Sequence, residues 1–101
     1  MRRDVFQAIA DPTRREIINM IAHKSLNLNS VAEKFNISRP AVSKHIKILT
    51  ECDVVKQKHT GREIYYHANL QKMKEIDIWL DQFRKQWEDR FGQLDDVLKD
   101  L

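Results

Sequence analysis

The segment from position 38 to position 47, Ser-Arg-Pro-Ala-Val-Ser-Lys-His-Ile-Lys, carries the clearest chemical signal in this sequence. It begins with Ser38, a residue type that caps helices, and continues with Pro40, which suits a first helical turn. From Val42 onward, apolar residues recur after four and then three positions, so they form a single stripe on a helix. The opposite face carries hydroxyl and basic groups. The pattern predicts a helix with one face in a core and the other against a polyanion.

The polar face of this predicted helix suits the chemistry of duplex DNA. Arg39 can donate two hydrogen bonds to a guanine edge, and Ser43 can bond several bases. Lys44 and Lys47 suit phosphates, which fix the position of a protein without reading the sequence. For His45, two interpretations stay open: a DNA contact, or a half-buried and hydrogen-bonded residue. The predicted DNA contacts are Ser38, Arg39, Pro40, Ser43, Lys44, His45, Lys47, Lys58 and Arg62.

Three shorter patterns precede this helix and explain how it is held. Apolar spacing predicts a short helix near residues 5–9 and a second helix after the Asp11-Pro12 cap. A third helix is predicted over about residues 30–35, with either Asn29 or Ser30 as its cap. Together with the helix that follows Ser38, this third helix matches a helix-turn-helix at about residues 30–50.

The remainder of the chain predicts a wing and a long final helix. Residues 54–67 change to β-type alternation around Thr60-Gly61, which indicates a hairpin. From residue 70 to residue 101, apolar residues follow one another at steps of three or four, which is typical of one continuous helix. The predicted fold class is therefore mainly α with a small β-hairpin wing, a winged helix-turn-helix in a single domain over residues 1–101.

Length, composition and charge exclude several classes of protein. A chain of 101 residues fits one domain, and no run of about 18 apolar residues is present that could span a membrane, so we expect no membrane partner. The single cysteine excludes an internal disulfide and fits a cytoplasmic protein. No glycine-rich phosphate loop, nucleophile elbow or paired carboxylates point to an enzyme. Residues 1–70 hold twelve Lys/Arg against seven Asp/Glu, so the basic excess lies on the side of the predicted helix-turn-helix.

Three blocks of sequence resemble the ArsR-type (arsenic-repressor-like) family of small bacterial winged-helix repressors. They are Phe-Gln-Ala-Ile-Ala-Asp-Pro-Thr-Arg-Arg-Glu-Ile at 6–17, Ser-Arg-Pro-Ala-Val-Ser-Lys-His-Ile-Lys-Ile-Leu at 38–49, and Gly-Arg-Glu-Ile-Tyr-Tyr at 61–66. The resemblance implies a homodimer that binds an inverted repeat in DNA and blocks transcription. It points to Ser38, Arg39, Ser43, Lys44, His45 and Arg62 as DNA-facing positions. The aromatic tail is similar to a branch of the family that acts without metal, often as autorepressors.

The last helix also predicts a partner of its own kind. A 30-residue apolar stripe with two tryptophans and two phenylalanines is too large for the core of a domain this size to cover. The family resemblance implies that the first and last helices form the dimer interface. The predicted interface residues are Val5, Phe6, Ile76, Trp79, Leu80, Phe83, Trp87 and Phe91.

Two alternatives to this interpretation concern metals and protein partners. Residues 26–35 lack the cysteine pair of the family's arsenic and lead sensors, and Lys72, Lys74 and Glu75 lie near where its zinc and nickel sensors place Asp and His ligands. We expect no metal site and no other cofactor, with a metal-responsive repressor as the alternative. A winged helix whose basic face binds an acidic protein is the other alternative. The sequence does not identify an effector.

For three further side chains we expect a structural role rather than a functional one. Arg14 and Arg15 follow the start of the second helix and are expected to face solvent. Cys52 is expected to pack near the end of its helix, because a lone thiol without a resolving partner makes a poor redox switch.

Overall fold

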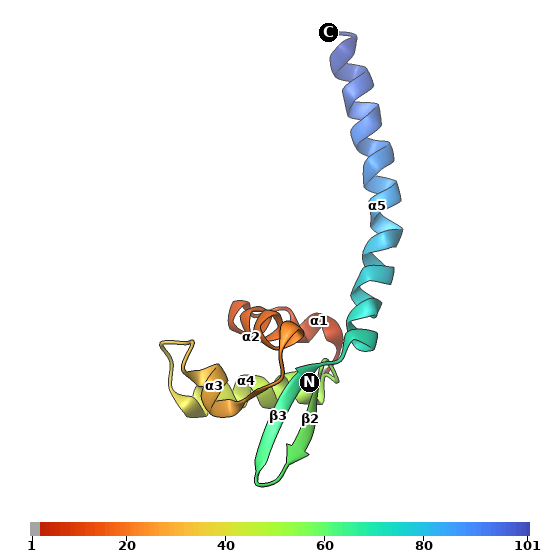
Figure 1. Cartoon of the computed structure of the whole chain (residues 1–101). Coiled ribbons are helices and arrows are strands. Elements are labelled where there is room, and N and C mark those ends of the chain that lie inside the picture. The colour runs from red at the N-terminus through yellow and green to blue at the C-terminus, as the bar shows by residue number, and fades with distance from the viewer. Residues whose placement is uncertain (1–2) are drawn as a thin grey trace.

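A computed structural model describes residues 3–101 and shows a mainly helical body with a small sheet and one long projecting helix (Figure 1). The elements in chain order are α1 (Val5–Ala8), α2 (Pro12–His23), β1 (Leu26–Asn27), α3 (Leu28–Ala32), α4 (Arg39–Glu51), β2 (Val55–Thr60), β3 (Glu63–Ala68) and α5 (Leu70–Lys99). The predicted fold class, mainly α with a β-hairpin wing, is confirmed. None of the helices within residues 3–101 has the length and apolar character needed to cross a bilayer.

Helix starts follow the capping residues of the sequence, with one difference. The Asp11 carboxylate accepts the backbone N–H of Arg14 at 3.0 Å, and α2 begins at the following proline. For α3 the cap is Asn27, whose side-chain oxygen accepts the Ser30 N–H at 2.9 Å, so the expectation of Asn29 or Ser30 was wrong. The physical reason is that Asn27 ends strand β1 with extended backbone, and an extended residue with a side-chain acceptor is the usual helix cap.

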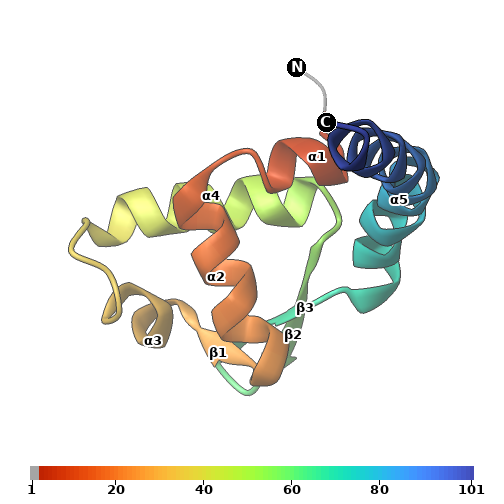
Figure 2. The ribbon, with the colours of Figure 1, turned by 90° about the horizontal axis from the view of Figure 1, so that it is seen from above.

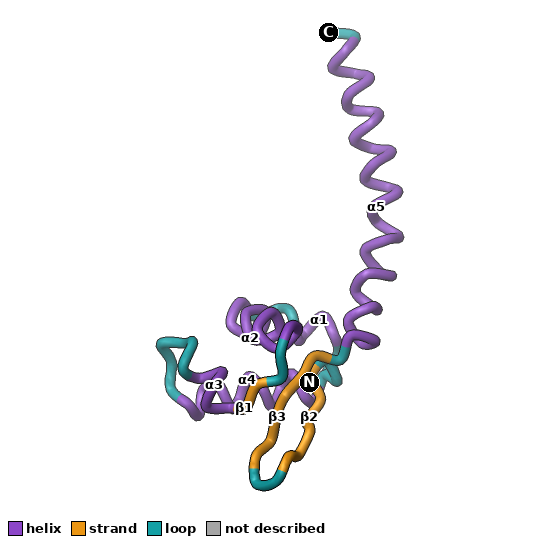
Figure 3. The backbone as a smooth tube through the Cα atoms, in the orientation of Figure 1, coloured by secondary structure: helices purple, strands orange, loops and turns teal. Residues whose placement is uncertain are grey.

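The wing is a three-stranded antiparallel sheet with the order β1-β3-β2 (Figure 3). Strands β2 and β3 form the predicted hairpin, and Gly61 lies in its turn with a φ of +64°, a left-handed conformation that glycine adopts without strain. The third strand, β1, pairs Leu26 with Tyr66 and was not predicted, because two residues are too few to show alternation. This strand joins the wing to the start of the helix-turn-helix.

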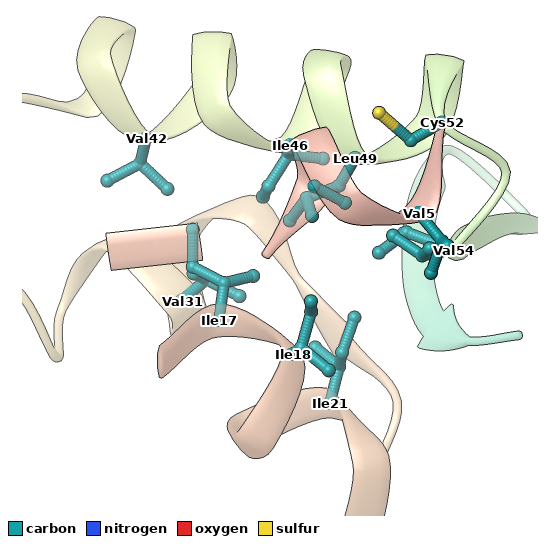
Figure 4. Close-up of a cluster of buried hydrophobic side chains, with 12 residues drawn as sticks. Val5, Ile17, Ile18, Ile21, Val31, Val42, Ile46, Leu49, Cys52 and Val54 are labelled. Atoms are coloured by element: carbon teal, nitrogen blue, oxygen red, sulfur yellow. The ribbon is translucent and has the colours of Figure 1, made fainter. Parts of the chain in front are cut away.

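The hydrophobic core lies between α1, α2, α3, α4 and the first residue of β2 (Figure 4). Buried aliphatic side chains from these elements form one cluster, consisting of Val5, Ala8, Ile17, Ile18, Ile21, Val31, Val42, Ile46, Leu49, Cys52, Val54 and Val55. Cys52 packs at the end of α4, as expected. Val5 was expected on the dimer interface, and this was wrong: its side chain is 1% exposed in the core. Val5 and Ala8 share the inward face of α1, which leaves Phe6 on the outward face.

Helix α5 leaves this body after its first turns. Met73 and Ile76 pack against the core, and no residue of α5 is fully buried. Seen from above, α5 lies beside α1 at the edge of the body (Figure 2). The remainder of the 30-residue helix projects away from the side that carries the hairpin tip, which explains the molecular extents of 66 × 29 × 28 Å. The predicted long helix is thus present, and its apolar stripe beyond Ile76 is exposed.

Candidate nucleic-acid interface

One face of α4 is buried and the opposite face is exposed, as the sequence predicts. Val42, Ile46 and Leu49 are buried, while the predicted contacts on the polar face are exposed. Those exposed residues are Ser38, Arg39, Pro40, Ser43, Lys44 and Lys47. Helix α3 contacts α4, and its buried Val31 belongs to the same cluster, so α3 braces the inner face. The geometry is that of a helix-turn-helix whose second helix offers its outer face to solvent.

The N-terminus of α4 and the turn of the wing share one hollow. Arg39 of α4 and Arg62 of the hairpin turn both line this space of about 250 Å³, together with Asn29 and Tyr66. A second hollow, of about 400 Å³, brings Ser43 and Lys47 of α4 beside Gln57 and Tyr66 of the sheet. Lys58 pairs across the hairpin with Tyr65 and lines neither space.

Two polar residues at these hollows were missed by the sequence analysis. Asn29 was considered only as a helix cap, and Gln57 was seen only as one residue of an alternating strand. Sequence alternation could have pointed to Gln57, because side chains alternate along a strand and this assigns Gln57 to one face of β2. For Asn29 no local signal exists, since its position at the hollow depends on how α3 meets the wing.

The cations of this surface are available to an outside anion. Among residues 3–101, no ion pair involves Arg39, Lys44, Lys47, Lys58 or Arg62. Positive groups without carboxylate partners bind phosphates without first breaking an internal pair. The arrangement of five such cations on α4 and the hairpin suits a polyanion that runs past both.

One carboxylate borders the first hollow and is itself engaged. Glu63 lines that space, and its Oε2 accepts the Tyr65 hydroxyl at 2.7 Å. The hydrogen bond to Glu63 and its negative charge raise the pKa of Tyr65. The Glu63 carboxylate, at the edge of the cationic surface, is therefore already hydrogen-bonded to the Tyr65 hydroxyl.

His45 is less exposed than the other predicted contacts on α4. Its side chain is 23% exposed, and Nδ1 lies 3.9 Å from the Asp11 carboxylate at the start of α2. Burial raises the pKa of Asp11, but the hydrogen bond from the Arg14 N–H and the charges of His45 and Arg14 outweigh it, so the net shift is downward. The structure thus places His45 at the junction of α4 and α2, between the core and the outer face.

Arg14 and Arg15 hold the end of α1. Arg14 donates from Nη2 to the Gln7 carbonyl at 2.9 Å and from Nε to the Ala8 carbonyl at 3.1 Å, so the expectation that it faces solvent was wrong. Arg15 is exposed as expected, and its Nη1 also donates to the Ile9 carbonyl at 2.7 Å. The last carbonyls of a helix have no partner within the helix, which explains why two guanidinium groups gather there.

The aromatic residues of the predicted dimer interface follow one another along two helices. We call them the aromatic ladder: Phe6 on α1, and Trp79, Phe83, Trp87 and Phe91 on α5. Phe6 meets Trp79 edge to face, with ring centroids 5.0 Å apart, and Trp79 lies 4.6 Å from Phe83. Further along α5, Trp87 and Phe91 are 6.0 Å apart. Ile76 is half-buried against the core, while Leu80 is exposed like the rings. Within residues 3–101, no group of three or more His, Cys, Asp or Glu side chains is arranged to hold a metal ion.

Comparison with known proteins places this geometry in a family. A family model described as bacterial regulatory protein, arsR family, matches residues 11–57. The transcriptional repressor SdpR of Bacillus subtilis (strain 168) is 36% identical over 80 residues, which cover 79% of this chain and 89% of that protein. The chain belongs to the ArsR family. Members of this family are transcription regulators that bind DNA, a class distinct from enzymes.

Two further proteins extend the likeness beyond the helix-turn-helix. The HTH-type transcriptional regulator Rv2034 of Mycobacterium tuberculosis is 35% identical over 78 residues, covering 77% of this chain and 73% of that protein. An ArsR-like transcriptional regulator from Rhodococcus sp. RHA1 has a similar structure, with a TM-score of 0.77 and 28% identity over 96% of this chain and 89% of that chain. The family model ends within β2, whereas the Rhodococcus structure covers nearly all of this chain.

Proposed function

We propose that this ArsR-family regulator is a transcriptional repressor that binds an inverted repeat of duplex DNA as a homodimer in the bacterial cytoplasm. The observation that carries the proposal is that Arg39, Lys44, Lys47, Lys58 and Arg62, on α4 and the hairpin, form no ion pair within residues 3–101. Repression is supported by the relatives, since SdpR is named a transcriptional repressor, and a 27% identical Staphylococcus xylosus protein is named an arsenical resistance operon repressor. In the proposed complex with DNA, α4 lies in the major groove and the hairpin lies beside it.

The side chains of α4 and the wing take different roles. Arg39 and Ser43 lie on the first turns of the exposed face, where a recognition helix meets base edges, so they read sequence. Lys44 and Lys47 contact phosphates of the backbone, and Ser38 with Pro40 starts the helix so that its free N–H groups face the same strand. Lys58 and Arg62 reach the backbone or minor groove beside the wing.

A second copy of the chain covers the aromatic ladder. Trp79, Phe83 and Trp87 follow one another at steps of four along α5 and are 44%, 36% and 48% exposed, and exposed apolar surface of this kind marks a protein interface. Pairing through α1 and α5 with twofold symmetry sets two α4 helices about 34–36 Å apart, which is one turn of DNA. The half-sites of the operator are then inverted copies of each other.

We further propose that no metal controls this binding. The family resemblance implies that zinc and nickel sensors place their ligands near the part of α5 that here holds Lys72, Lys74 and Glu75, and a protonated lysine cannot coordinate zinc. The Lys72 ammonium is instead paired with Glu75 at 3.0 Å. Operator affinity measured with added zinc and with a chelator tests this point, and a change of tenfold or more in either arm contradicts it.

Fluorescence anisotropy tests the DNA-binding proposal. A labelled duplex from upstream of the protein's own gene is titrated at several salt concentrations, beside a scrambled duplex of equal composition. We expect tighter binding to the natural duplex and a log–log salt slope of about −0.9 per phosphate contact. Equal affinity for both duplexes contradicts a sequence-specific repressor. Binding of an acidic peptide in place of either duplex would support the protein-binding alternative.

A further inference from the structure

Glu63 is an acidic residue within the cationic surface of the wing and α4. It lies at the start of β3 and lines the hollow of about 250 Å³ that also holds Arg39 of α4 and Arg62 of the hairpin turn. Of the residues within 3–101 that line this hollow, Glu63 alone carries a carboxylate. Strand β1 pairs with β3 at Tyr65 and Tyr66, so Glu63 lies on the part of β3 that extends beyond β1. Glu63 is therefore at an open edge of the wing, near the first turn of α4.

The Glu63 carboxylate is paired with neither arginine of the hollow. No ion pair within residues 3–101 joins it to Arg39 or Arg62, and its Oε2 accepts the Tyr65 hydroxyl at 2.7 Å instead. Tyr65 belongs to the central strand of the sheet and is held by β1 on one side and β2 on the other. Side chains alternate along a strand, so residues 63 and 65 share one face of β3. The negative charge thus stays in the hollow while both guanidinium groups keep no carboxylate partner.

The free acceptor sites of Glu63 limit what it can bind on DNA. An ionised carboxylate has about four lone-pair sites, of which the Tyr65 hydroxyl occupies one. The DNA backbone has no hydrogen-bond donor, and its phosphates repel a carboxylate. The donors on the base edges are exocyclic amino groups: N6 of adenine and N4 of cytosine in the major groove, and N2 of guanine in the minor groove. Glu63 can therefore gain a hydrogen bond from DNA only at a base edge.

We propose that Glu63 is a specificity-determining residue that repels the backbone of noncognate DNA and accepts a hydrogen bond from a base amino group at the operator. The inference rests on the proposed function, because it requires the hairpin to lie beside a groove of duplex DNA. On noncognate DNA the carboxylate offsets part of the attraction between phosphates and the two arginines. At the operator it gains a charge-assisted hydrogen bond, which is stronger than a neutral one. Tyr65 is a positioning residue that keeps the carboxylate away from the arginines.

Glu63→Gln removes the charge and keeps the shape of the side chain. Glutamine can still accept the Tyr65 hydroxyl, but its amide also donates, so it no longer distinguishes an amino group from a phosphate. We expect affinity for a scrambled duplex to rise about two- to fivefold at low salt, the size of one exposed charge interaction. Affinity for the natural duplex should not rise, so the ratio of the two affinities falls. Higher salt should reduce the rise, because ions screen exposed charges.

Glu88→Gln is the matched control for net charge. It removes an equally exposed carboxylate from α5, which projects away from the hairpin tip (Figure 1). Both affinities should stay within about 1.5-fold of the unchanged protein, because charges further apart than a Debye length are largely screened. A rise on scrambled DNA as large in Glu88→Gln as in Glu63→Gln would assign the effect to total charge and overturn the inference.

A duplex without one amino group tests the hydrogen bond directly. Single-base operator variants identify the base pair at which Glu63→Gln relaxes the preference, and a base analogue that lacks the amino group is placed there. The unchanged protein should bind this duplex about fivefold or more weakly than the operator. Glu63→Gln should lose less than about twofold, since the two changes remove the same contact. An equal loss in both proteins, or no relaxed base pair at all, overturns the inference.

Tyr65→Phe tests the positioning role with the charge retained. We expect the scrambled-duplex affinity of the unchanged protein together with a weaker preference at the same base pair, because the carboxylate has lost the donor that orients it. A variant that behaves as the unchanged protein in both assays contradicts the role of Tyr65. Melting curves verify that each variant is folded, and Tyr65→Phe takes the place of Glu63→Gln in the base scan if the latter is not.

The same titrations separate this inference from the proposed function. If the unchanged protein binds natural and scrambled duplexes equally, the proposed sequence-specific function fails, whereas the rise on scrambled DNA in Glu63→Gln still measures repulsion by the carboxylate. If the unchanged protein prefers the natural duplex and Glu63→Gln keeps the same ratio of affinities, the proposed function stands and the role of Glu63 is overturned.

Discussion

The body of the molecule and its last helix distribute apolar and charged side chains in opposite ways. Residues 3–69 supply every member of the buried cluster, and the cations predicted to contact DNA on α4 and the hairpin form no ion pair within residues 3–101. Helix α5 supplies none of that cluster, and its charges pair along its own surface, as in Arg84 with Asp77 at 3.0 Å. The body therefore folds around its own core and exposes positive charge, whereas α5 exposes an apolar stripe, which we propose a second copy of the chain covers.

The largest expected effect comes from removing a side chain on the core side of this division. Leu49 is fully buried beneath α4, so Leu49→Ala creates a cavity and costs about 2–5 kcal/mol of unfolding free energy. Leu101→Ala is the matched control just beyond the C-cap of α5, where the side chain is 95% exposed and the expected change is within about 0.5 kcal/mol. Urea unfolding of both variants measures the difference. Equal losses would mean that the two regions do not differ in packing.

The next effect tests the apolar stripe of α5. Trp87→Ala is expected to weaken the free energy of dimerisation by about 2 kcal/mol or more, because large aromatic side chains in an interface carry most of its binding energy. The neighbouring Gln86→Ala provides the control, since Gln86 is exposed and lies beside the aromatic ladder. Sedimentation at a series of concentrations measures both. An unchanged dimer in Trp87→Ala would place the partner surface elsewhere.

The cationic surface of the body predicts two distinguishable losses. Arg39→Ala costs about 1–3 kcal/mol at the cognate operator and relaxes the preference at one base pair. Lys47→Ala weakens binding to all duplexes alike and reduces the salt slope by about 0.9, the contribution of one phosphate contact. Competition assays with single-base operator variants separate the two. If both substitutions lower cognate and scrambled binding equally, the division of roles between Arg39 and Lys47 is wrong.

The sequence predicted what local chemistry determines. Ser38, Pro40 and the stripe from Val42 are local signals, and they identified α4 and its exposed face. Contacts between residues far apart in the chain were not predictable in this way. The pairing of β1 with β3 depends on tertiary packing, as does the hold of Arg14 on the end of α1.

His45 and Val5 show the same limit within the candidate functional sites. The helix period places His45 between two faces, but only the position of α2 sets it 3.9 Å from Asp11. Helix α1 has only four residues, about one turn, and a pattern this short does not reveal which side meets the core. The structure assigns Val5 to the core and Phe6 to the surface that faces Trp79.

The smallest expected effect is an acid dependence that belongs to the body alone. The hydrogen bond from the Arg14 N–H and the charges of His45 and Arg14 outweigh burial and hold the pKa of Asp11 below its ordinary value of 3.8. A carboxyl group whose pKa is lowered on folding stabilises the protein at pH values above its ordinary pKa, and this contribution is lost as the pH falls through the lowered pKa.

Asp11→Asn lacks the contribution, so its melting temperature should lie slightly below that of the unchanged protein at neutral pH and converge with it in acid. Asp95→Asn removes one exposed carboxylate from α5 as the control. A difference between the unchanged protein and Asp11→Asn that stays constant down to about pH 2 would show that the charge of Asp11 stabilises nothing in the body.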